Sequence, residues 1–449
     1  MQKNWYESKK NLQELQYINF RLKNDLSSGI NTLPILDIYR HYNDIESMEG
    51  QYITQYVNME LPVLNEAVKF YEKMTALGSM DNASNYADHC CITAGATSAI
   101  TALFEYIYCT RPNASFLFLG YQYFLFGFLA KKYDLKYKTL ISSVSNKNAP
   151  SICEIEQELE SKSYDYILLT HPFNPSGEIF EKEEIVQLLS LVKRRSISLI
   201  IDKCQCDEAF ISMHTDFYNI GQIITEHKAE ESIVVIHSFS KIRSIPGVRF
   251  GYVLGKKDMV DFVKYFCEMH YGMNGLTYIV SILIDLFFQT ILICKHIPVL
   301  TLKKTFRHMI MICFEQGIAR NIIFKLMSSD DFEIKLKNYT EQLLKHNTTM
   351  HNNFTTIKSV FEQNPYVDFT TMRSSYNFLL LYSNPYQITE KKFQELIAAQ
   401  LNSIIFTQRN FCATNQMNTI CMRLSCADIN GEYLSKITKL NEMLFEKIK

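Results

Sequence analysis

Short apolar runs without polar alternation recur in the middle of the chain, at Ser115–Leu119, Tyr166–Thr170, Ile197–Ile201, Ile233–Ile236 and Phe250–Leu254. Continuous runs of this kind are typical of strands that are buried on both faces. Between two of them lies Glu181–Arg195, an amphipathic segment whose acidic residues come first and whose basic residues come last, as the dipole of a helix favours. This strand–helix–strand alternation predicts an α/β fold with a mainly parallel sheet, which binds ligands at the carboxyl ends of its strands.

The flanking regions have a different pattern. A mostly helical region rich in Met, Ile and Phe leads to a long polar helix from about Phe332 to Glu362. After it, Tyr376–Tyr382 and Ile420–Leu424 are predicted strands around a helix at Lys391–Leu401. We predict a mainly parallel mixed sheet flanked by helices, together with a smaller α+β domain. The expected parts are an N-terminal segment at 1–50 that packs with the small domain, a large domain at 51–331 with an extra helical region at about 276–327, and an interdomain helix with the small domain at 332–449.

Composition and charge exclude several classes of protein. Of 449 residues, 47% are hydrophobic and 21% are charged, which is a globular balance. The 46 basic and 47 acidic residues leave a net charge of -1, so a dedicated nucleic-acid or membrane-surface binder is not expected. The 12 cysteines are scattered through mostly apolar runs and form no CxxC pair, which predicts reduced structural thiols and no metal site.

One stretch, Leu276–Cys294, has the apolar character of a membrane segment. It barely reaches spanning length and carries Asp285 and Gln289 in its middle, so we predict a buried helix rather than a membrane span. The first residues show no secretory signal. Together with the reduced thiols, this predicts a cytoplasmic protein.

The segment Ile236–Gly255 carries the most informative chemistry. Lys241 follows a predicted buried strand, after the hydroxyl groups of Ser238 and Ser240, and Arg249 comes eight residues later. Partial burial lowers the pKa of a lysine, and the neutral amine can then attack a carbonyl group. An arginine at the end of a strand can hold an anion, best of all a phosphate. From these residues alone, a solvated Lys/Arg pair at the edge of the sheet is the alternative.

The string Ser-x-Ser-Lys-(x)5-Gly-x-Arg-x-Gly at Ser238–Gly251 resembles the lysine signature of fold-type I pyridoxal-phosphate enzymes, in the class I/II aminotransferase family. The resemblance implies that pyridoxal 5'-phosphate is the cofactor and that Lys241 forms its Schiff base and shuttles a proton at the substrate Cα. It also implies that Ser238 and Arg249 hold the cofactor phosphate, with Ser240 in the same cofactor-binding set.

Upstream motifs agree with the resemblance in order and spacing. Asp202 ends an apolar run, and Asn174-Pro175-Ser176-Gly177 lies 28 residues before it. By resemblance, Asp202 keeps the pyridine nitrogen protonated, and Asn174 donates to the ring oxygen and also contacts substrate. The family has a tyrosine three residues after the aspartate, but this chain has Gln205, which can still donate to the cofactor. On its own, Asp202 would be interpreted as a helix-capping residue.

The phosphate and the ring have further expected partners. Gly95, Ala96 and Thr97 begin a helix-like stretch, where backbone N–H groups make an anion site. By resemblance, Tyr123 stacks on the pyridine ring, although Tyr121 stands where the family usually has proline. An aromatic cluster within the core is the alternative for Tyr123.

The last motifs concern the substrate and the subunit interface. By resemblance, Arg423 binds the substrate α-carboxylate through two parallel hydrogen bonds. Gly29 belongs to an N-terminal stretch that closes over substrate, and Tyr56 reaches the phosphate of a neighbouring subunit. The resemblance therefore implies a homodimer whose small-molecule substrate is an amino acid.

Several functions are compatible with these residues. The leading hypothesis is an aminotransferase that takes an L-amino acid and passes its amino group to a 2-oxo acid. Gln205 and the extra helical region keep a lyase, a cyclase or another elimination or replacement enzyme on the same fold as the alternative. A non-catalytic binding protein is a third hypothesis, which the intact motif residues disfavour. A nicotinamide-dependent dehydrogenase is disfavoured because no GxGxxG follows a predicted strand.

Overall fold

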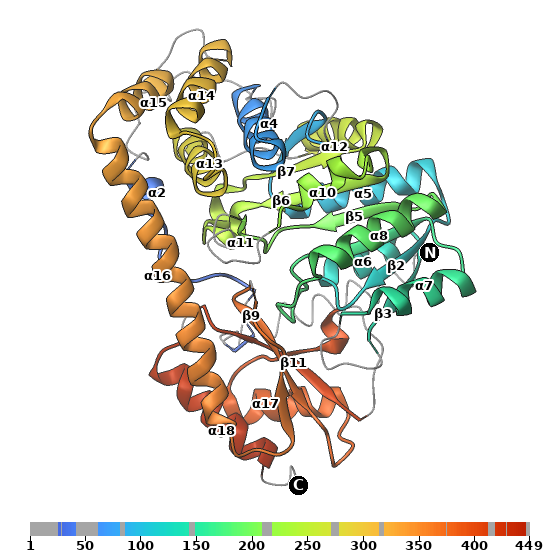
Figure 1. The fold of residues 1–449 in the computed structure, drawn as a ribbon. Coiled ribbons are helices and arrows are strands. Elements are labelled where there is room, and N and C mark those ends of the chain that lie inside the picture. Colours follow the sequence, from blue (N-terminus) through green and yellow to red (C-terminus); the bar gives the residue numbers. More distant parts are fainter. Residues whose placement is uncertain are drawn as a thin grey trace. The chain divides into compact units, whose positions relative to one another are not determined.

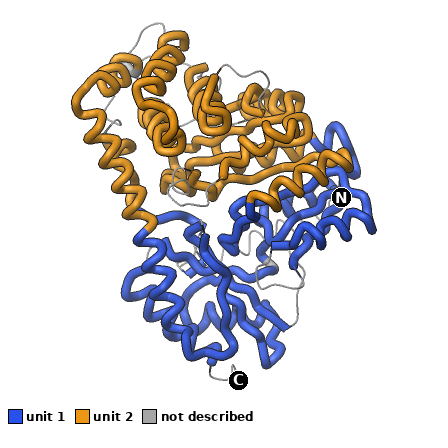
Figure 2. Tube along the Cα trace, in the orientation of Figure 1, with its two compact units in different colours: residues 1–33, 107–181, 348–449 blue, residues 34–106, 182–347 orange. Residues whose placement is uncertain are grey.

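The computed structural model describes residues 26–27, 29–41, 62–80, 86–142, 149–208, 218–270, 278–313, 318–373, 375–411, 418–427 and 429–445 (Figure 1). The chain divides into two compact units (Figure 2). Unit 1 contains Met1–Leu33, Ile107–Glu181 and Thr348–Lys449, and unit 2 contains Pro34–Tyr106 and Lys182–Asn347. Each unit is therefore built from separate stretches of sequence. The predicted three-part domain division stays a prediction.

A seven-stranded mixed sheet has the order β1-β7-β6-β5-β4-β2-β3, as the apolar runs predicted. The strand β5 pairs with β6, and β2 with β3 and β4, in parallel, whereas β7 is antiparallel to both β1 and β6. The strands are β1 (Cys90–Thr93), β2 (Ser115–Leu119), β3 (Lys136–Leu140), β4 (Tyr166–Thr170), β5 (Ser198–Asp202), β6 (Ile233–Ser238) and β7 (Gly251–Gly255). Helices flank this sheet (Figure 1).

The second sheet lies in unit 1 and is antiparallel, with the order β10-β11-β9-β8. Its strands are β8 (Val367–Phe369), β9 (Asn377–Tyr382), β10 (Phe406–Thr407) and β11 (Ile420–Ser425). The other elements of unit 1 are α6 (Phe124–Lys132), α7 (Ile152–Ser161), α17 (Glu390–Leu401), α18 (Gly431–Phe445) and the short helix η5 (Gln408–Phe411).

Both faces of this smaller sheet are buried, by different partners. Phe378, Leu380 and Tyr382 alternate along β9 on the face that packs with the apolar residues of α17 and α18. Leu379 and Leu381 lie on the opposite face, where the cluster also contains residues from outside the sheet, Tyr121 and Phe411. Because side chains alternate along a strand, the two faces of β9 and β11 can serve separate purposes.

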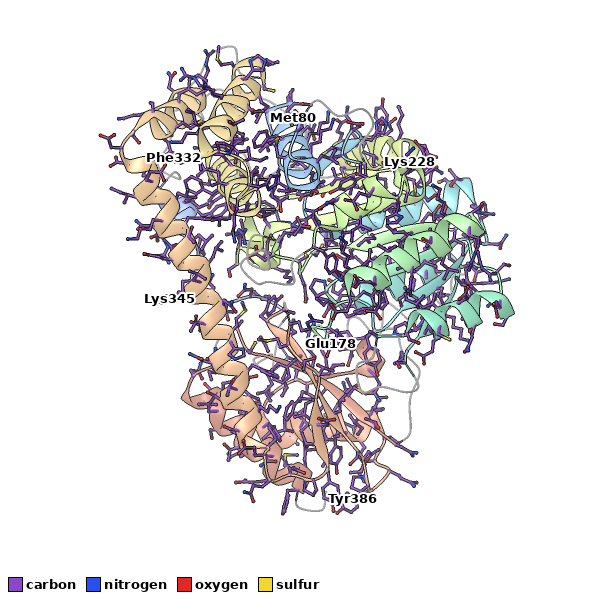
Figure 3. All side chains as sticks on the ribbon, in the orientation of Figure 1. Met80, Glu178, Lys228, Phe332, Lys345 and Tyr386 are labelled. Atoms are coloured by element: carbon purple, nitrogen blue, oxygen red, sulfur yellow. The ribbon has the colours of Figure 1, made fainter. Side chains whose placement is uncertain are left out.

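Unit 2 is mostly helical outside its strands. Its elements are α2 (Ile38–His41), α4 (Pro62–Leu77), α8 (Lys182–Arg195), α10 (Ile220–Glu226), η2 (Glu230–Ser232), α11 (Phe239–Ile242), η3 (Pro246–Val248), α12 (Lys257–His270), α13 (Ile279–Ile293), α14 (Val299–Cys313) and α15 (Ile318–Ser328). Two helices cross from one unit into the other along the sequence, namely α5 (Ala96–Thr110) and α16 (Asp331–Val360). Helix α16 is the predicted long polar helix. Phe332 anchors its first turn, because the Phe332 ring lies 6.1 Å from that of Phe287 and 5.7 Å from that of Phe288, both in α13. Phe332 and Lys345 of this helix are labelled in Figure 3.

The apolar stretch with an aspartate in its middle forms α13, which is buried almost throughout, as predicted. No helix within the described part of the chain is long and apolar enough to cross a membrane. Asp285 is completely buried and accepts hydrogen bonds from Tyr39 (2.6 Å), Gln289 (2.9 Å), Tyr339 (2.5 Å) and the Nε of Arg243 (2.9 Å). A buried carboxylate needs such partners, because an unpaired charge in the core is strongly destabilising.

We expect Asp285→Leu to lower the free energy of unfolding by about 3–5 kcal/mol, because it removes the completely buried one of the two carboxylates that pair with the guanidinium of Arg243. Chemical denaturation measures this loss. The double variant Arg243→Met/Asp285→Leu removes both charges and should recover most of the stability.

Asp261→Asn is the control, since it weakens an exposed ion pair with Lys257. It should leave the denaturation midpoint unchanged. A double variant that is less stable than Asp285→Leu alone would contradict the pairing argument.

Candidate active site

In unit 2, the register of two parallel strands brings the predicted lysine and aspartate to one edge of the sheet. Asp202 is the last residue of β5 and pairs with Ile236 of β6, and β6 runs on for two residues into the helix α11 that carries Lys241. Cys204 is close enough to Asp202 and Lys241 for both charges to affect the pKa of its thiol. Burial and the carboxylate of Asp202 raise the pKa of its thiol, and the ammonium of Lys241 opposes that shift.

Asp202 itself is buried at this edge. Burial raises the pKa of its carboxyl group, while hydrogen bonds from the thiol and the backbone N–H of Cys204 lower that pKa. The backbone nitrogen lies 2.9 Å from Oδ1 of Asp202. Gln205, which stands in place of the family tyrosine, is also buried. A nearby cation would favour the ionised carboxylate, so this site fits a protonated ring nitrogen.

Gly95, Arg249 and Ser238 converge at the same edge. In the paired strands, Gly251 of β7 stands opposite both Thr93 of β1 and Ser238 of β6. The guanidinium of Arg249 donates to the carbonyl oxygen of Ala94 at 2.6 Å. Its Nη2 would lie only 2.9 Å from a Cβ built on Gly95. The hydroxyl groups of Ser238 and Ser240 are 3.1 Å apart.

These groups surround the start of α5. Gly95 is buried with a φ of +80°, Ala96 is half-buried and Thr97 is exposed. The first N–H groups of a helix have no partner within the helix, and together with an arginine they form an anion site. Arg249 also has a left-handed backbone, with φ 57° and ψ 40°, which is uncommon for a residue with a side chain. The cradle therefore fits a phosphate group.

Behind this edge lies a buried polar network that sequence reasoning missed. Lys203, the residue after Asp202, donates to Glu208 at 2.6 Å, and Tyr71 donates to the other oxygen of Glu208 at 2.8 Å. Burial would lower the pKa of Lys203, but the charges of Glu208 and Glu72 raise it overall. The lysine therefore stays charged and paired, which makes it an anchor for the loop after Asp202.

His237 lies inside β6 next to this network, as a packed residue. Its ring stacks on Tyr252 with 4.9 Å between centroids and 3° between planes. Burial lowers its pKa, and the positive charges of Lys203 and Arg243 lower it further. His237 is therefore neutral.

A second missed residue, Arg243, follows Lys241 by two positions. Its buried guanidinium bonds Asp285, Asp207 and the hydroxyl of Tyr339, the last at 3.2 Å. Burial would lower its pKa, but Asp207 and Asp285 raise it well above the usual value. The sequence signal was the aspartate within an apolar helix, which needs a buried cation as its partner.

In unit 1, Asn174 lies in a tight turn after β4. The turn closes through hydrogen bonds of 2.8 Å from Phe173 N–H to the carbonyl oxygen of Glu178, and from Gly177 N–H to that of Phe173. Glu178, labelled in Figure 3, accepts a hydrogen bond of 2.9 Å from the backbone of Thr371. Asn174 is 7% exposed, and its Oδ1 has no partner within the described residues. It therefore has an acceptor to offer to a ligand.

Arg423 lies on β11 of unit 1 and is only 5% exposed. Its Nη2 donates to the carbonyl oxygen of Ser27 at 2.6 Å, and its guanidinium carbon lies 5.0 Å from the ring of Phe406 and 5.2 Å from that of Phe411. In the described part of the chain, no carboxylate pairs with Arg423, and its Nε has no partner. Burial lowers its pKa to about 10, so the folded chain holds a cation that a carboxylate ligand would stabilise.

Gly29 and Tyr123 belong to the surroundings of Arg423. A Cβ built on Gly29 would lie 3.2 Å from Nη2 of Arg423. Tyr123 precedes α6, its ring lies 4.5 Å from Phe124, and it contributes to the pKa of Arg423. Tyr56 lies outside the described residues, so its role stays a prediction. The predicted site residues therefore form two groups. Unit 2 contains Gly95, Asp202, Lys241 and Arg249, and unit 1 contains Gly29, Tyr123 and Arg423.

Comparison with known proteins identifies the family and the fold. The sequence profile described as "Aminotransferase class I and II" matches residues 23–439. Among curated proteins, 1-aminocyclopropane-1-carboxylate synthase of Malus domestica is 29% identical over 190 residues, which is 38% of each chain. Histidinol-phosphate aminotransferase of Buchnera aphidicola subsp. Diuraphis noxia is 24% identical over 234 residues, 50% of this chain and 61% of that protein. The alignments thus span less than two thirds of these relatives.

Solved structures match over nearly the whole chain. Aspartate aminotransferase from Thermotoga maritima has a TM-score of 0.65 at 15% identity, covering 98% of this chain and 96% of that one. N-Succinyldiaminopimelate aminotransferase from Mycobacterium tuberculosis has a TM-score of 0.69 at 12% identity, covering 96% of each chain. At such low identity the likeness establishes the fold.

The phosphate cradle is tested by Gly95→Ala. The new Cβ would push Arg249 aside, and the left-handed backbone at φ +80° disfavours alanine. We expect pyridoxal phosphate to bind about 10- to 100-fold more weakly, as for a lost hydrogen bond to a charged group. Equilibrium titration of the purified protein measures the affinity.

Gly247→Ala is the matched control in the same motif, because nothing lies within 4 Å of its added Cβ. It should bind the cofactor as the parent does. Equal weakening in both variants would count against the cradle.

Proposed function

Because the chain belongs to the aminotransferase class I and II family, whose enzymes depend on pyridoxal 5'-phosphate, we propose that it transfers the amino group of an L-amino acid to a 2-oxo acid. The observation that supports this most is the shared edge in unit 2, where Asp202 and Lys241 stand next to an anion cradle. These are the groups that the cofactor needs at its ring nitrogen, its aldehyde carbon and its phosphate.

In this proposal each residue of unit 2 has one task. The bound cofactor supplies an electron sink for the bonds at the substrate Cα. Lys241 would hold the cofactor through Nζ, and the same amine would move the proton at the substrate Cα. Asp202 keeps its carboxylate against the ring nitrogen, and Arg249, Ser238, Ser240 and the N–H groups of Gly95, Ala96 and Thr97 bind the phosphate.

The residues of unit 1 bind and orient the reactants. Arg423 binds the substrate α-carboxylate, since its buried guanidinium has no carboxylate of its own among the described residues. The amide nitrogen of Asn174 would donate to the cofactor oxygen, and its Oδ1, which has no partner among the described residues, would accept a hydrogen bond from the substrate. Tyr123 would stack on the cofactor ring, and Gly29 belongs to the N-terminal segment that would close over substrate.

A second candidate is a lyase, a cyclase or another elimination or replacement enzyme with the same cofactor. Gln205 favours it, because an amide cannot ionise as the family tyrosine does. The 1-aminocyclopropane-1-carboxylate synthase among the relatives shows that similarity to this family extends beyond transaminases. Product analysis separates the two candidates, since elimination releases ammonia without consuming a 2-oxo acid.

We further propose a cytoplasmic homodimer. Both parts rest on the sequence: the dimer on the family resemblance, including Tyr56, and the compartment on the scattered cysteines. Sedimentation of the loaded protein tests the dimer.

The function is tested by adding a panel of amino acids to the cofactor-loaded protein. We expect at least one amino acid to shift the visible absorbance and to release its own 2-oxo acid. If the loaded protein is instead reduced with borohydride before any amino acid is added, peptide mass spectra should show the cofactor attached covalently to Lys241. Lys241→Ala should lose both signals.

Arg423→Met should still hold the cofactor but lose the response to amino acids by at least about 100-fold, because it removes a charge-assisted carboxylate contact. Arg373→Met, which breaks an ion pair with Glu181 at the surface of the same unit, is the control and should respond normally. Cofactor uptake without 2-oxo acid formation across the whole panel would reject the aminotransferase.

A further inference from the structure

Asn377 begins β9 and is completely buried, yet neither amide atom of its side chain has a partner within the described part of the chain. A buried polar atom without a hydrogen bond destabilises the folded chain, because its hydration is lost and nothing replaces it. A folded protein rarely keeps such a residue without a use, because an apolar side chain of the same shape would be more stable there.

The strand register shows which way Asn377 faces. It pairs with Ser425 of β11, while Leu379 pairs with Arg423. Residues directly opposite in an antiparallel pair share a face, and so do residues two apart on one strand. Asn377 and Arg423 therefore lie on the same face of the small sheet, as diagonal neighbours. The other end of that face is apolar, with Leu381 packed in the Tyr121 cluster.

The turn that carries Asn174 lies against this position. A Cβ built on Gly177 would be 2.9 Å from the backbone oxygen of Asn377. Unit 1 therefore brings together three buried residues with unpartnered polar atoms within the described ranges: Oδ1 of Asn174, both amide atoms of Asn377 and Nε of Arg423. A ligand that accepts hydrogen bonds would satisfy the two donors in this set, Nδ2 of Asn377 and Nε of Arg423.

The chemistry of these atoms points to a carboxylate. An ionised carboxylate only accepts hydrogen bonds and has about four acceptor positions. Arg423 has already given one Nη2 hydrogen bond to the backbone of Ser27, so it cannot fill them alone. The amide nitrogen of Asn377 is a neutral donor at the next place on the same face.

We propose that Asn377 is a substrate-binding residue, whose Nδ2 donates to the carboxylate that Arg423 binds. The inference rests on the proposed function, because it assigns a second donor to the carboxylate site of that reaction. It restricts the substrates to amino acids and 2-oxo acids with a free α-carboxylate, and it disfavours their amides and esters, which lack one charged oxygen.

The test compares Asn377→Leu with Asn364→Leu. Asn364 is also a buried asparagine of unit 1, but its Nδ2 donates to Asn441 at 2.8 Å and its Oδ1 accepts from the Tyr366 N–H at 3.1 Å. For Asn377→Leu we expect an unchanged or raised Tm, because no protein hydrogen bond is lost. For Asn364→Leu we expect a lowered Tm.

Binding is measured by calorimetry with pyruvate and with its neutral amide, and KM is measured with the amino acid that reacts best. Asn377→Leu should weaken pyruvate binding and raise KM, each by about 10- to 100-fold, as expected for the loss of a hydrogen bond to a charged group. Affinity for the amide and cofactor absorbance should not change. Asn377→Asp should weaken pyruvate binding further, since the new carboxylate would pair with Arg423 and repel the ligand.

A lowered Tm with unchanged pyruvate affinity in Asn377→Leu would overturn the inference and make Asn377 a structural residue. Equal losses for pyruvate and its amide would also overturn it. A parent protein that binds pyruvate but transforms no amino acid would reject the proposed reaction instead, and the calorimetric comparison would still decide the role of Asn377.

Discussion

The buried ion pair between Arg243 and Asp285 is the constraint on which the lysine-bearing segment depends. Lys241 sits on α11, a single turn of helix that is too short to be stable alone. Arg243 ties that turn to α13 through Asp285, to α16 through Tyr339 and to the loop after Asp202 through Asp207. Because moving either partner away would leave a charge unpaired in the core, the pair permits essentially one arrangement of these segments.

The two buried arginines of the described chain, one in each unit, differ in whether a carboxylate of the protein pairs with them. Arg243 has two carboxylates, and they raise its pKa despite burial. Arg423 is buried without any, and burial lowers its pKa to about 10. The first is satisfied by the protein and fixes the fold. The second has a backbone oxygen and two aromatic rings as partners, but no carboxylate among the described residues offsets its desolvation.

Sequence reasoning predicted the strands that are buried on both faces, because an uninterrupted apolar run has few other interpretations. It did not predict β3, where Lys136–Leu140 mixes polar and apolar residues and is partly exposed, or β1, which is only four residues long. It also identified Asp285 as unusual but could not find Arg243, 42 residues away, because a pairing between distant elements depends on how they pack. Asn377 could not be found at all, since its need for a partner is visible only once the surrounding hydrogen bonds are known.

Motif residues were predictable for a related reason. In Gly-x-Arg-x-Gly, a Cβ on Gly251 would lie 2.8 Å from the carbonyl oxygen of His237 and 2.9 Å from the Cα of Gly95, so only glycine lets β1, β6 and β7 approach around the cradle. Such backbone contacts do not depend on the substrate, and they fix the spacing of the motif along the chain. Side chains such as Asn377, on the other sheet, are under no such backbone constraint, and for that reason no spacing rule reveals them.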